Sequence, residues 1–365
     1  MNSEYIVQPY EIEEQLAKIW ESLQGKGKTR ASLFNLVIYT AKNSRINYLY
    51  EIAQKLIDKF PCRVLFVTID DTIQEDTVKT SVAVMITTSS GGATACDLIN
   101  IVLSKNTQER APFMVLPHLL TDLPIYLLWG DDPSQVNPLS QKLEKLATRV
   151  IFDSESTKDL VDFAKAVLTH RQASGSDIAD LNWGRVEGWR QMLAETFKSR
   201  ERLDLLRNMK EITITYNCLE TPFFCHNKIQ ALYLQAWIAS QLSWTLMTTQ
   251  KNSQATKLEY EKAATITLLA KKVPSLAPGR ILELSFQGGD GCHFHFVRDS
   301  VSSQIVHIHH STPHFCQLPL QFILDRYESG QSLVKEIFHK GTSRHYLNLL
   351  HNLAGVKKKD LSAYE

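Results

Sequence analysis

Four histidines occur at alternating positions in two short segments near residue 300. His293 and His295 alternate with phenylalanines, and His307 and His309 alternate with aliphatic residues. Because successive side chains of a strand point to opposite faces, this pattern predicts a β-hairpin with all four imidazoles on one face. The predicted register places His293 opposite His309 and His295 opposite His307. The cluster could hold a transition metal, bind an anionic ligand or make a pH-sensitive contact. The alternative is a polar hairpin face with no ligand, because no cysteine or carboxylate clearly completes a metal site.

A second cluster combines aromatic and cationic side chains between residues 180 and 190. Trp183 and Trp189 are large enough to anchor packing between domains, and Arg185 and Arg190 carry groups that bind carboxylates and phosphates. We expect these four residues to contact a partner or a ligand. The alternative is a hinge that the two aromatic rings fix in place.

Acidic side chains follow two predicted strands. Asp153 and Ser154 follow a strand at Val150–Phe152, and Asp131 follows an apolar strand at Leu123–Trp129. Ligands of α/β sheets bind at the carboxyl ends of strands, so Asp153 and Ser154 are further candidates for binding. One hypothesis is therefore a sugar-phosphate- or nucleotide-binding enzyme or sensor that uses the strand ends near Asp131 and Asp153. Helix capping is the simpler interpretation of these acids.

Two domains are expected to position these residues. Alternating helix and strand patterns predict an α/β domain over residues 1–172, with a mixed sheet and flanking helices. Residues 173–365 predict an α+β domain with an antiparallel sheet and a long helix at Lys228–Met247, whose Trp237 and Trp244 would share a face. The Ser- and Gly-containing stretch Gln172–Asp177 is interpreted as the linker.

One hairpin is expected within the first domain. The short Ser89-Ser90-Gly91-Gly92 segment separates the predicted strands Val78–Thr87 and Cys96–Leu103. A turn of this length favours an antiparallel pair over a parallel crossover.

Composition excludes several classes of protein. The 365 residues include 40 Lys+Arg and 39 Asp+Glu, so the formal net charge is +1. This balance argues against a disordered chain and against electrostatic binding of nucleic acid. The longest apolar run is too short to span a membrane, and no signal peptide is visible, so a cytoplasmic protein with reduced cysteines is expected. No phosphate-binding, hydrolase or zinc-protease motif occurs, so no cofactor is predicted.

Four segments of the chain form an ordered set of motifs. They are LPHLLTDLPIYLLW at Leu116–Trp129, IFDS at Ile151–Ser154, DLNWGRVEGWR at Asp180–Arg190 and WIASQLSW at Trp237–Trp244. In type and in order, over about residues 110–245, they resemble motifs of the OpcA family, the glucose-6-phosphate dehydrogenase assembly proteins.

This resemblance implies a role without catalysis. Members of the family are partners of glucose-6-phosphate dehydrogenase in the oxidative pentose phosphate pathway of carbohydrate metabolism. The chain would then be an assembly factor or allosteric activator that binds the dehydrogenase and supports its active oligomer. Such binding must favour the active state over the inactive one. The sequence makes no prediction about self-association.

Overall fold

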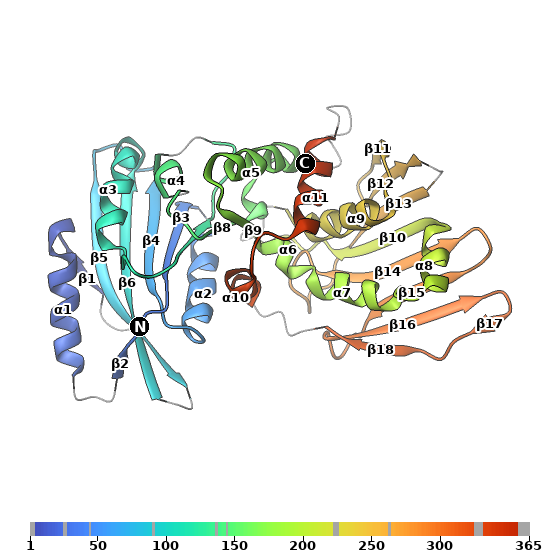
Figure 1. Ribbon diagram of the computed structural model, residues 1–365, viewed down its shortest axis with the longest axis horizontal. Coiled ribbons are helices and arrows are strands. Elements are labelled where there is room, and N and C mark those ends of the chain that lie inside the picture. Colours follow the sequence, from blue (N-terminus) through green and yellow to red (C-terminus); the bar gives the residue numbers. More distant parts are fainter. Residues whose placement is uncertain are drawn as a thin grey trace. The chain divides into compact units, whose positions relative to one another are not determined.

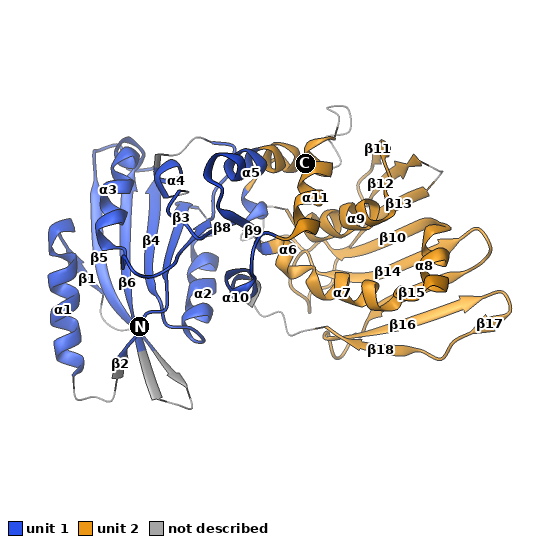
Figure 2. Ribbon diagram, viewed as in Figure 1, with its two compact units in different colours: residues 1–156, 166–181, 328–342 blue, residues 157–165, 182–327, 343–365 orange. Residues whose placement is uncertain are grey.

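The computed structural model describes residues 4–24, 28–43, 45–89, 92–135, 138–143, 145–221, 226–261, 264–324 and 331–356 (Figure 1). The chain divides into two compact units, which Figure 2 shows in different colours. Unit 1 comprises residues 1–156, 166–181 and 328–342, and unit 2 comprises residues 157–165, 182–327 and 343–365. Each fold combines one sheet with flanking helices, an α/β unit followed by an α+β unit. Among the described helices, none is long and apolar enough to cross a membrane.

The stretch predicted as a linker is regular structure. Helix α5 (Leu160–Ser174) runs into it, and strand β9 (Asp177–Asp180) begins at its end. The linker prediction is therefore wrong, and the predicted boundary at residue 172 falls inside α5. Gly175 explains the composition, because its positive φ of 69° makes a tight connection between the helix and the strand.

The sheet of unit 1 contains a run of six parallel strands. Their spatial order is β6-β4-β3-β7-β8-β9. Numbered along the chain, this is the order 3-2-1-4-5-6 of the Rossmann dinucleotide-binding fold. The strands are β3 (Asn35–Ala41), β4 (Arg63–Asp70), β6 (Gly92–Ser104), β7 (Ile125–Trp129), β8 (Arg149–Phe152) and β9.

Three further strands extend this sheet. β5 (Val78–Ser89) pairs antiparallel with β6, which confirms the predicted hairpin. Ser90 and Gly91 of its turn lie outside the described residues. β1 (Tyr5–Val7) pairs antiparallel with β5, and β2 (Lys28–Arg30) pairs with β6.

One face of this sheet is covered by helix α2 (Ile46–Ile57) and helix α10 (Gln331–Phe338). The apolar stripe of α2, including Leu49 and Ile52, packs in one core with strand residues such as Leu36 and Phe66. Leu333 of α10 belongs to the same core, although it is contributed by a distant part of the chain. The helices on this face of the sheet thus come from an early and a late part of the sequence. The other helices before α5 are α1 (Ile12–Leu23), α3 (Ala111–Val115) and α4 (Pro138–Leu143).

The sheet of unit 2 is mostly antiparallel. Its order is β11-β12-β13-β10-β14-β15-β16-β17, with β18 also on β16, and β10 and β13 form its parallel pair. Phe197 packs against Phe286 and Phe294, with ring centroids 5.6 and 4.9 Å apart, so these rings form the core on the helical face. The strands are β10 (Met209–Asn217), β11 (Leu246–Lys251), β12 (Ala255–Tyr260), β13 (Ala264–Lys271), β14 (Ile281–Gly288), β15 (His293–Arg298), β16 (Ile305–Thr312), β17 (Phe315–Cys316) and β18 (Leu320–Ile323).

The long helix of unit 2 is shorter than predicted. Helix α9 (Ile229–Leu242) stops where Ser243 adopts the left-handed conformation, with φ 55° and ψ 41°. The N–H of Trp244 then bonds back to the Ala239 carbonyl at 2.9 Å. Trp237 therefore lies on α9 and Trp244 lies in the connection that follows it, which corrects the prediction of a shared helical face. The other helices here are α6 (Leu181–Arg185), α7 (Glu187–Thr196), α8 (Arg200–Arg207) and α11 (Arg344–Ala354).

Gly130, directly after β7, allows α2 to lie close to the sheet. A Cβ atom at this position would lie 2.7 Å from Leu49 Cδ1 and 3.1 Å from the Tyr39 carbonyl oxygen. We expect Gly130→Ala to lower the free energy of unfolding by about 1–3 kcal/mol, because the buried side chain and backbone must move apart. Gly289→Ala is the matched control, since its Cβ would meet only Lys210 Cγ at 3.9 Å. Denaturant unfolding measures both, and equal stability of the two variants would contradict the close packing.

Candidate functional site

The carboxyl edge of the parallel strands in unit 1 is where a Rossmann fold binds its ligand. The order of the strands reverses between β3 and β7, and this crevice is the expected position of a dinucleotide. Here the ends of the two strands are joined by a ring contact and a hydrogen bond. Tyr39 and Trp129 stack with centroids 4.2 Å apart and planes 8° apart, and the Gly130 N–H donates to the Tyr39 carbonyl at 2.8 Å.

A buried ion cluster occupies the start of α2 at this edge. Arg45 directly precedes the helix and is 1% exposed. Its guanidinium donates to the carboxylate of Asp153 and, at 2.8 Å, to that of Glu155. Both acids follow β8 and are almost completely buried. The side chain thus ties the loop after β3 to the loop after β8.

Burial and charge act against each other in this cluster. Burial would lower the pKa of Arg45, but the adjacent carboxylates outweigh it and raise that pKa above its usual value. Burial raises the pKa of Glu155 to about 8, against the opposing effect of Arg45, and the charge of Asp153 raises it further. The guanidinium of Arg45 is therefore shared between two carboxyl groups, and that of Glu155 holds its proton near neutral pH.

Ser154 extends this network to the next strand. Its backbone N–H and its hydroxyl both donate to the carboxylate of Asp180, at 3.0 and 3.1 Å. Asp153, Ser154 and Asp180 are all fully buried. Asp153 and Ser154 were predicted to contact a partner or ligand, and this burial assigns them instead to the interior of unit 1. The strand-end position was a useful signal, but the contacts made there are internal.

This edge lacks the chemistry that binds a dinucleotide. The Rossmann fingerprint places glycines between the first strand and its helix, so that a pyrophosphate can approach the backbone. Here the sequence is Ala-Lys-Asn-Ser-Arg at 41–45. The carboxyl group of Asp131 already has an internal partner, because it accepts the Asp132 N–H at 2.8 Å. Burial also raises the pKa of Asp131. The geometry thus disfavours the nucleotide hypothesis at Asp131 and Asp153.

The four histidines lie on one face of the unit 2 sheet, but in a different register from the one predicted. His295 is opposite His309, whereas His293 is opposite Ser311 and His307 is opposite Val297. The predicted pairs are wrong by two residues. A shift of two leaves every side chain on its face, so alternation cannot detect it. The turn decides instead, because the Asp299 carboxylate accepts the N–H groups of Val301 and Ser302.

Three of these histidines have hydrogen-bond partners on their own face. His293 contacts Ser285 at 2.9 Å, His295 contacts Glu283, and His307 contacts Asp299 at 3.0 Å. In the part of the chain that the structure describes, no group of three His, Cys, Asp or Glu side chains is suited to a metal ion. The metal role of His293, His295, His307 and His309 stays a prediction without geometric support.

The cluster at residues 180–190 is built into unit 2. Trp183 and Trp189 are buried, and Trp183 packs against Tyr346 with centroids 5.6 Å apart. The guanidinium of Arg190 lies 3.3 Å from the centre of the Trp183 ring and donates to the Trp183 carbonyl. Arg185 donates to the Asn182 side chain at 2.7 Å. These contacts favour a structural role, and direct contact with a partner stays a prediction for this cluster.

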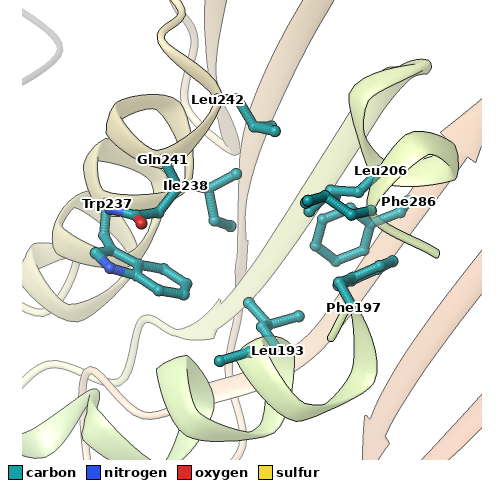
Figure 3. Close-up of a pocket in the computed structure, with 10 residues that line it drawn as sticks. Leu193, Phe197, Leu206, Trp237, Ile238, Gln241, Leu242 and Phe286 are labelled. Atoms are coloured by element: carbon teal, nitrogen blue, oxygen red, sulfur yellow. The ribbon is translucent and has the colours of Figure 1, made fainter. Parts of the chain in front are cut away.

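An apolar cavity of about 150 Å³ lies beside α9 in unit 2 (Figure 3). Trp237 and Leu242 come from α9, Leu193 comes from α7, and Phe286 comes from β14. Among the lining residues, Gln241 contributes the one side-chain amide. The cavity is suited to an apolar group and provides no set of acids or bases for catalysis.

Sequence reasoning missed Arg45 and Glu155. The partners of the ion cluster are separated by 108 and 110 positions, so no local pattern connects them. The sequence nevertheless contained one signal. Arg45 stands in the segment after the first parallel strand, where a dinucleotide-binding Rossmann fold carries glycines.

The fold of this chain has a likeness among solved structures. The 3-ketoreductase KijD10 from Actinomadura kijaniata, solved with NADP, matches with a TM-score of 0.50 at 9% identity, covering 91% of this chain and 96% of that one. The likeness concerns the fold alone.

The sequence itself matches known family models in both halves of the chain. Residues 53–169 match the family described as the glucose-6-phosphate dehydrogenase subunit N-terminal domain, and residues 176–346 match the corresponding C-terminal domain. The chain belongs to the OpcA family.

Curated relatives agree with this assignment. The OxPP cycle proteins OpcA of Nostoc punctiforme and Synechococcus elongatus are each 30% identical, over 209 and 189 residues. These matches cover 55% and 50% of this chain, and 42% and 40% of the relatives. The chain thus matches less than half the length of these relatives.

We expect Arg45→Leu to destabilise unit 1 strongly. The substitution leaves the Asp153 carboxylate buried without its cation and the Glu155 carboxyl group without its hydrogen-bond donor, and breaking a buried ion pair in this way costs about 3–5 kcal/mol. Lys42→Met is the control, because the Lys42–Asp70 pair is exposed on the lysine side and should contribute ~0–1 kcal/mol. Denaturant unfolding of both variants measures the difference, and a loss below 1 kcal/mol for Arg45→Leu would refute the importance of the cluster.

The raised pKa of Glu155 predicts the pH dependence of stability. The folded carboxyl has a pKa of about 8 and the unfolded one about 4.5, so between these values the folded state binds the extra proton. Stability should therefore fall as pH rises from about 5 to about 8, by up to ~1.4 kcal/mol per pH unit. Glu155→Gln should flatten this slope, and Glu14→Gln, an exposed control, should not. Unfolding measured at several pH values decides, and an unchanged slope in Glu155→Gln would contradict the assignment.

Proposed function

We propose that this chain is a non-catalytic partner of glucose-6-phosphate dehydrogenase. In this role it binds the dehydrogenase and supports its active oligomer in the oxidative pentose phosphate pathway. The observation that carries the proposal is the filled carboxyl edge of unit 1. A fold that binds dinucleotides in other proteins has its crevice occupied by Arg45, Asp153 and Glu155, while the sequence belongs to a family named for the dehydrogenase.

An exposed strand of unit 2 supports a surface for this association. We define the apolar edge as Phe315, Leu318, Leu320 and Ile323, on and beside β17 and β18. All four side chains are exposed, Leu318 by 85% and Ile323 by 73%. β18 pairs with β16 on one side, and no described strand pairs with its other side.

Edge strands are usually protected in proteins that stay monomeric. Lysine, proline or a bulge commonly blocks unwanted pairing, yet β18 itself has the sequence Leu-Gln-Phe-Ile. Exposed apolar side chains beside an unpaired strand edge are typical of a protein–protein interface, and Leu320 and Ile323 lie on the two faces of β18 that flank this edge. We therefore assign the apolar edge as the surface that meets the dehydrogenase.

The test combines co-purification with an activity titration. Glucose-6-phosphate dehydrogenase is titrated with the full chain, and complex formation and the substrate saturation curve are measured. We expect a complex and either a higher activity or a lower apparent KM. No complex and no kinetic change would overturn the proposed function.

The double substitution Leu320→Ser and Ile323→Ser tests the surface. It removes exposed apolar side chains without touching the core, so the fold should persist while dehydrogenase affinity falls at least about tenfold, or ~1.4 kcal/mol. Ile6→Ser with Tyr10→Ser is the control, because these apolar side chains of unit 1 are even more exposed than Leu320 and Ile323. Loss of binding in the control, with binding kept in the β18 variant, would place the interface elsewhere.

A further inference from the structure

A second cavity of unit 2, of about 420 Å³, has a polar lining that neither the fold nor the proposed association uses. It lies among α9, β11, β12 and α11, which contribute Gln235, Met247, Tyr260 and Asn352 to its walls. Its volume falls in the range of small-molecule sites, about 300–1,000 Å³. The polar groups around it therefore indicate which ligand it could take.

Gln235 provides the most specific feature of this cavity. The side chain is fully buried, and its amide oxygen accepts the hydroxyl of Tyr260. The amide nitrogen has no hydrogen-bond partner, although it is also buried. Nearly all buried donors in proteins are paired, so an unpaired donor on a cavity wall indicates a missing acceptor. A ligand oxygen would supply that acceptor once the amide, whose nitrogen is not accessible from the cavity in this structure, turns towards it.

Two aromatic rings form part of the same wall. Trp244 and Tyr260 are both mostly buried, with centroids 5.8 Å apart and planes tilted by 42°. Their faces offer an apolar surface beside the polar amide. A ligand with an apolar C–H face and polar edges matches this combination.

The charge of the described lining residues favours a neutral ligand over an anionic one. Among the described lining residues there is no lysine or arginine, and the one formal charge is the carboxylate of Glu261. Glu261, His351 and Asn352 are exposed, so they provide acceptors and donors at the mouth of the cavity. A phosphate or carboxylate group would be repelled by Glu261 and would find no lysine or arginine among these described residues.

We propose that this cavity binds a neutral, hydroxyl-rich small molecule of the size of a monosaccharide. A ligand hydroxyl accepts the unpaired N–H of Gln235, the sugar ring stacks on Trp244, and outer hydroxyls bond to Glu261 and Asn352. Hydroxyl groups donate and accept, which suits a lining that mixes both types of group. The site is independent of the apolar edge, so its failure leaves the proposed association intact.

The experiment uses the full chain and defined probes. D-Glucose, D-fructose and D-ribose are titrated separately, with glucose 6-phosphate as the charged counterpart, by saturation-transfer NMR and calorimetry. We expect at least one neutral sugar to bind and glucose 6-phosphate to bind more weakly. No binding by any neutral sugar, or tighter binding of glucose 6-phosphate, would overturn the proposal.

Three variants localise the site. Gln235→Leu keeps the volume of the side chain but removes the donor, and it should weaken sugar binding at least about tenfold. Glu261→Ala changes an exposed residue, so it should fold normally and also weaken binding. Trp237→Leu, which alters the separate apolar cavity, should leave binding unchanged. Equal affinity in wild type, Gln235→Leu and Glu261→Ala, or a loss confined to Trp237→Leu, would reject this cavity as the site.

Discussion

One buried guanidinium connects two loops at the carboxyl edge of the unit 1 sheet. Arg45 holds the loops after β3 and β8 through Asp153 and Glu155, on both sides of the point where the strand order reverses. Three ionisable groups out of water are costly, and a well-packed apolar core is often as stable as such a cluster. The cluster fixes the geometry of an edge that in related folds must stay open for a ligand.

The sequence predicted the fold where local patterns determine it. The β5–β6 hairpin follows from the short turn between its strands, because the contacts that form it are short-range. Patterns failed where one residue or a distant partner decides. Ser243 ends α9 through its own backbone conformation, and the Asp299 turn sets a register that alternation leaves ambiguous. The partners of Arg45 are more than 100 positions away, beyond the reach of any local pattern.

Helix α9 separates two chemically different cavities. The tryptophans of its family motif were predicted to share one core face, yet Trp237 lines the apolar cavity and Trp244 lines the polar one. The early end of the helix causes this division, because the chain turns after Ser243 before Trp244 is placed. A motif that resembled simple core packing thus contributes to two separate surfaces of unit 2.

The return of residues 328–342 to unit 1 has a consequence for protein synthesis. Arg149 donates to the carbonyls of His339 and Gly341, and Leu333 fills the core under α2. A ribosome must therefore produce all of residues 182–327 before unit 1 receives its last helix. Until then the apolar surface that α10 covers stays exposed on the nascent chain. Completion of the first unit consequently waits for translation of most of the second.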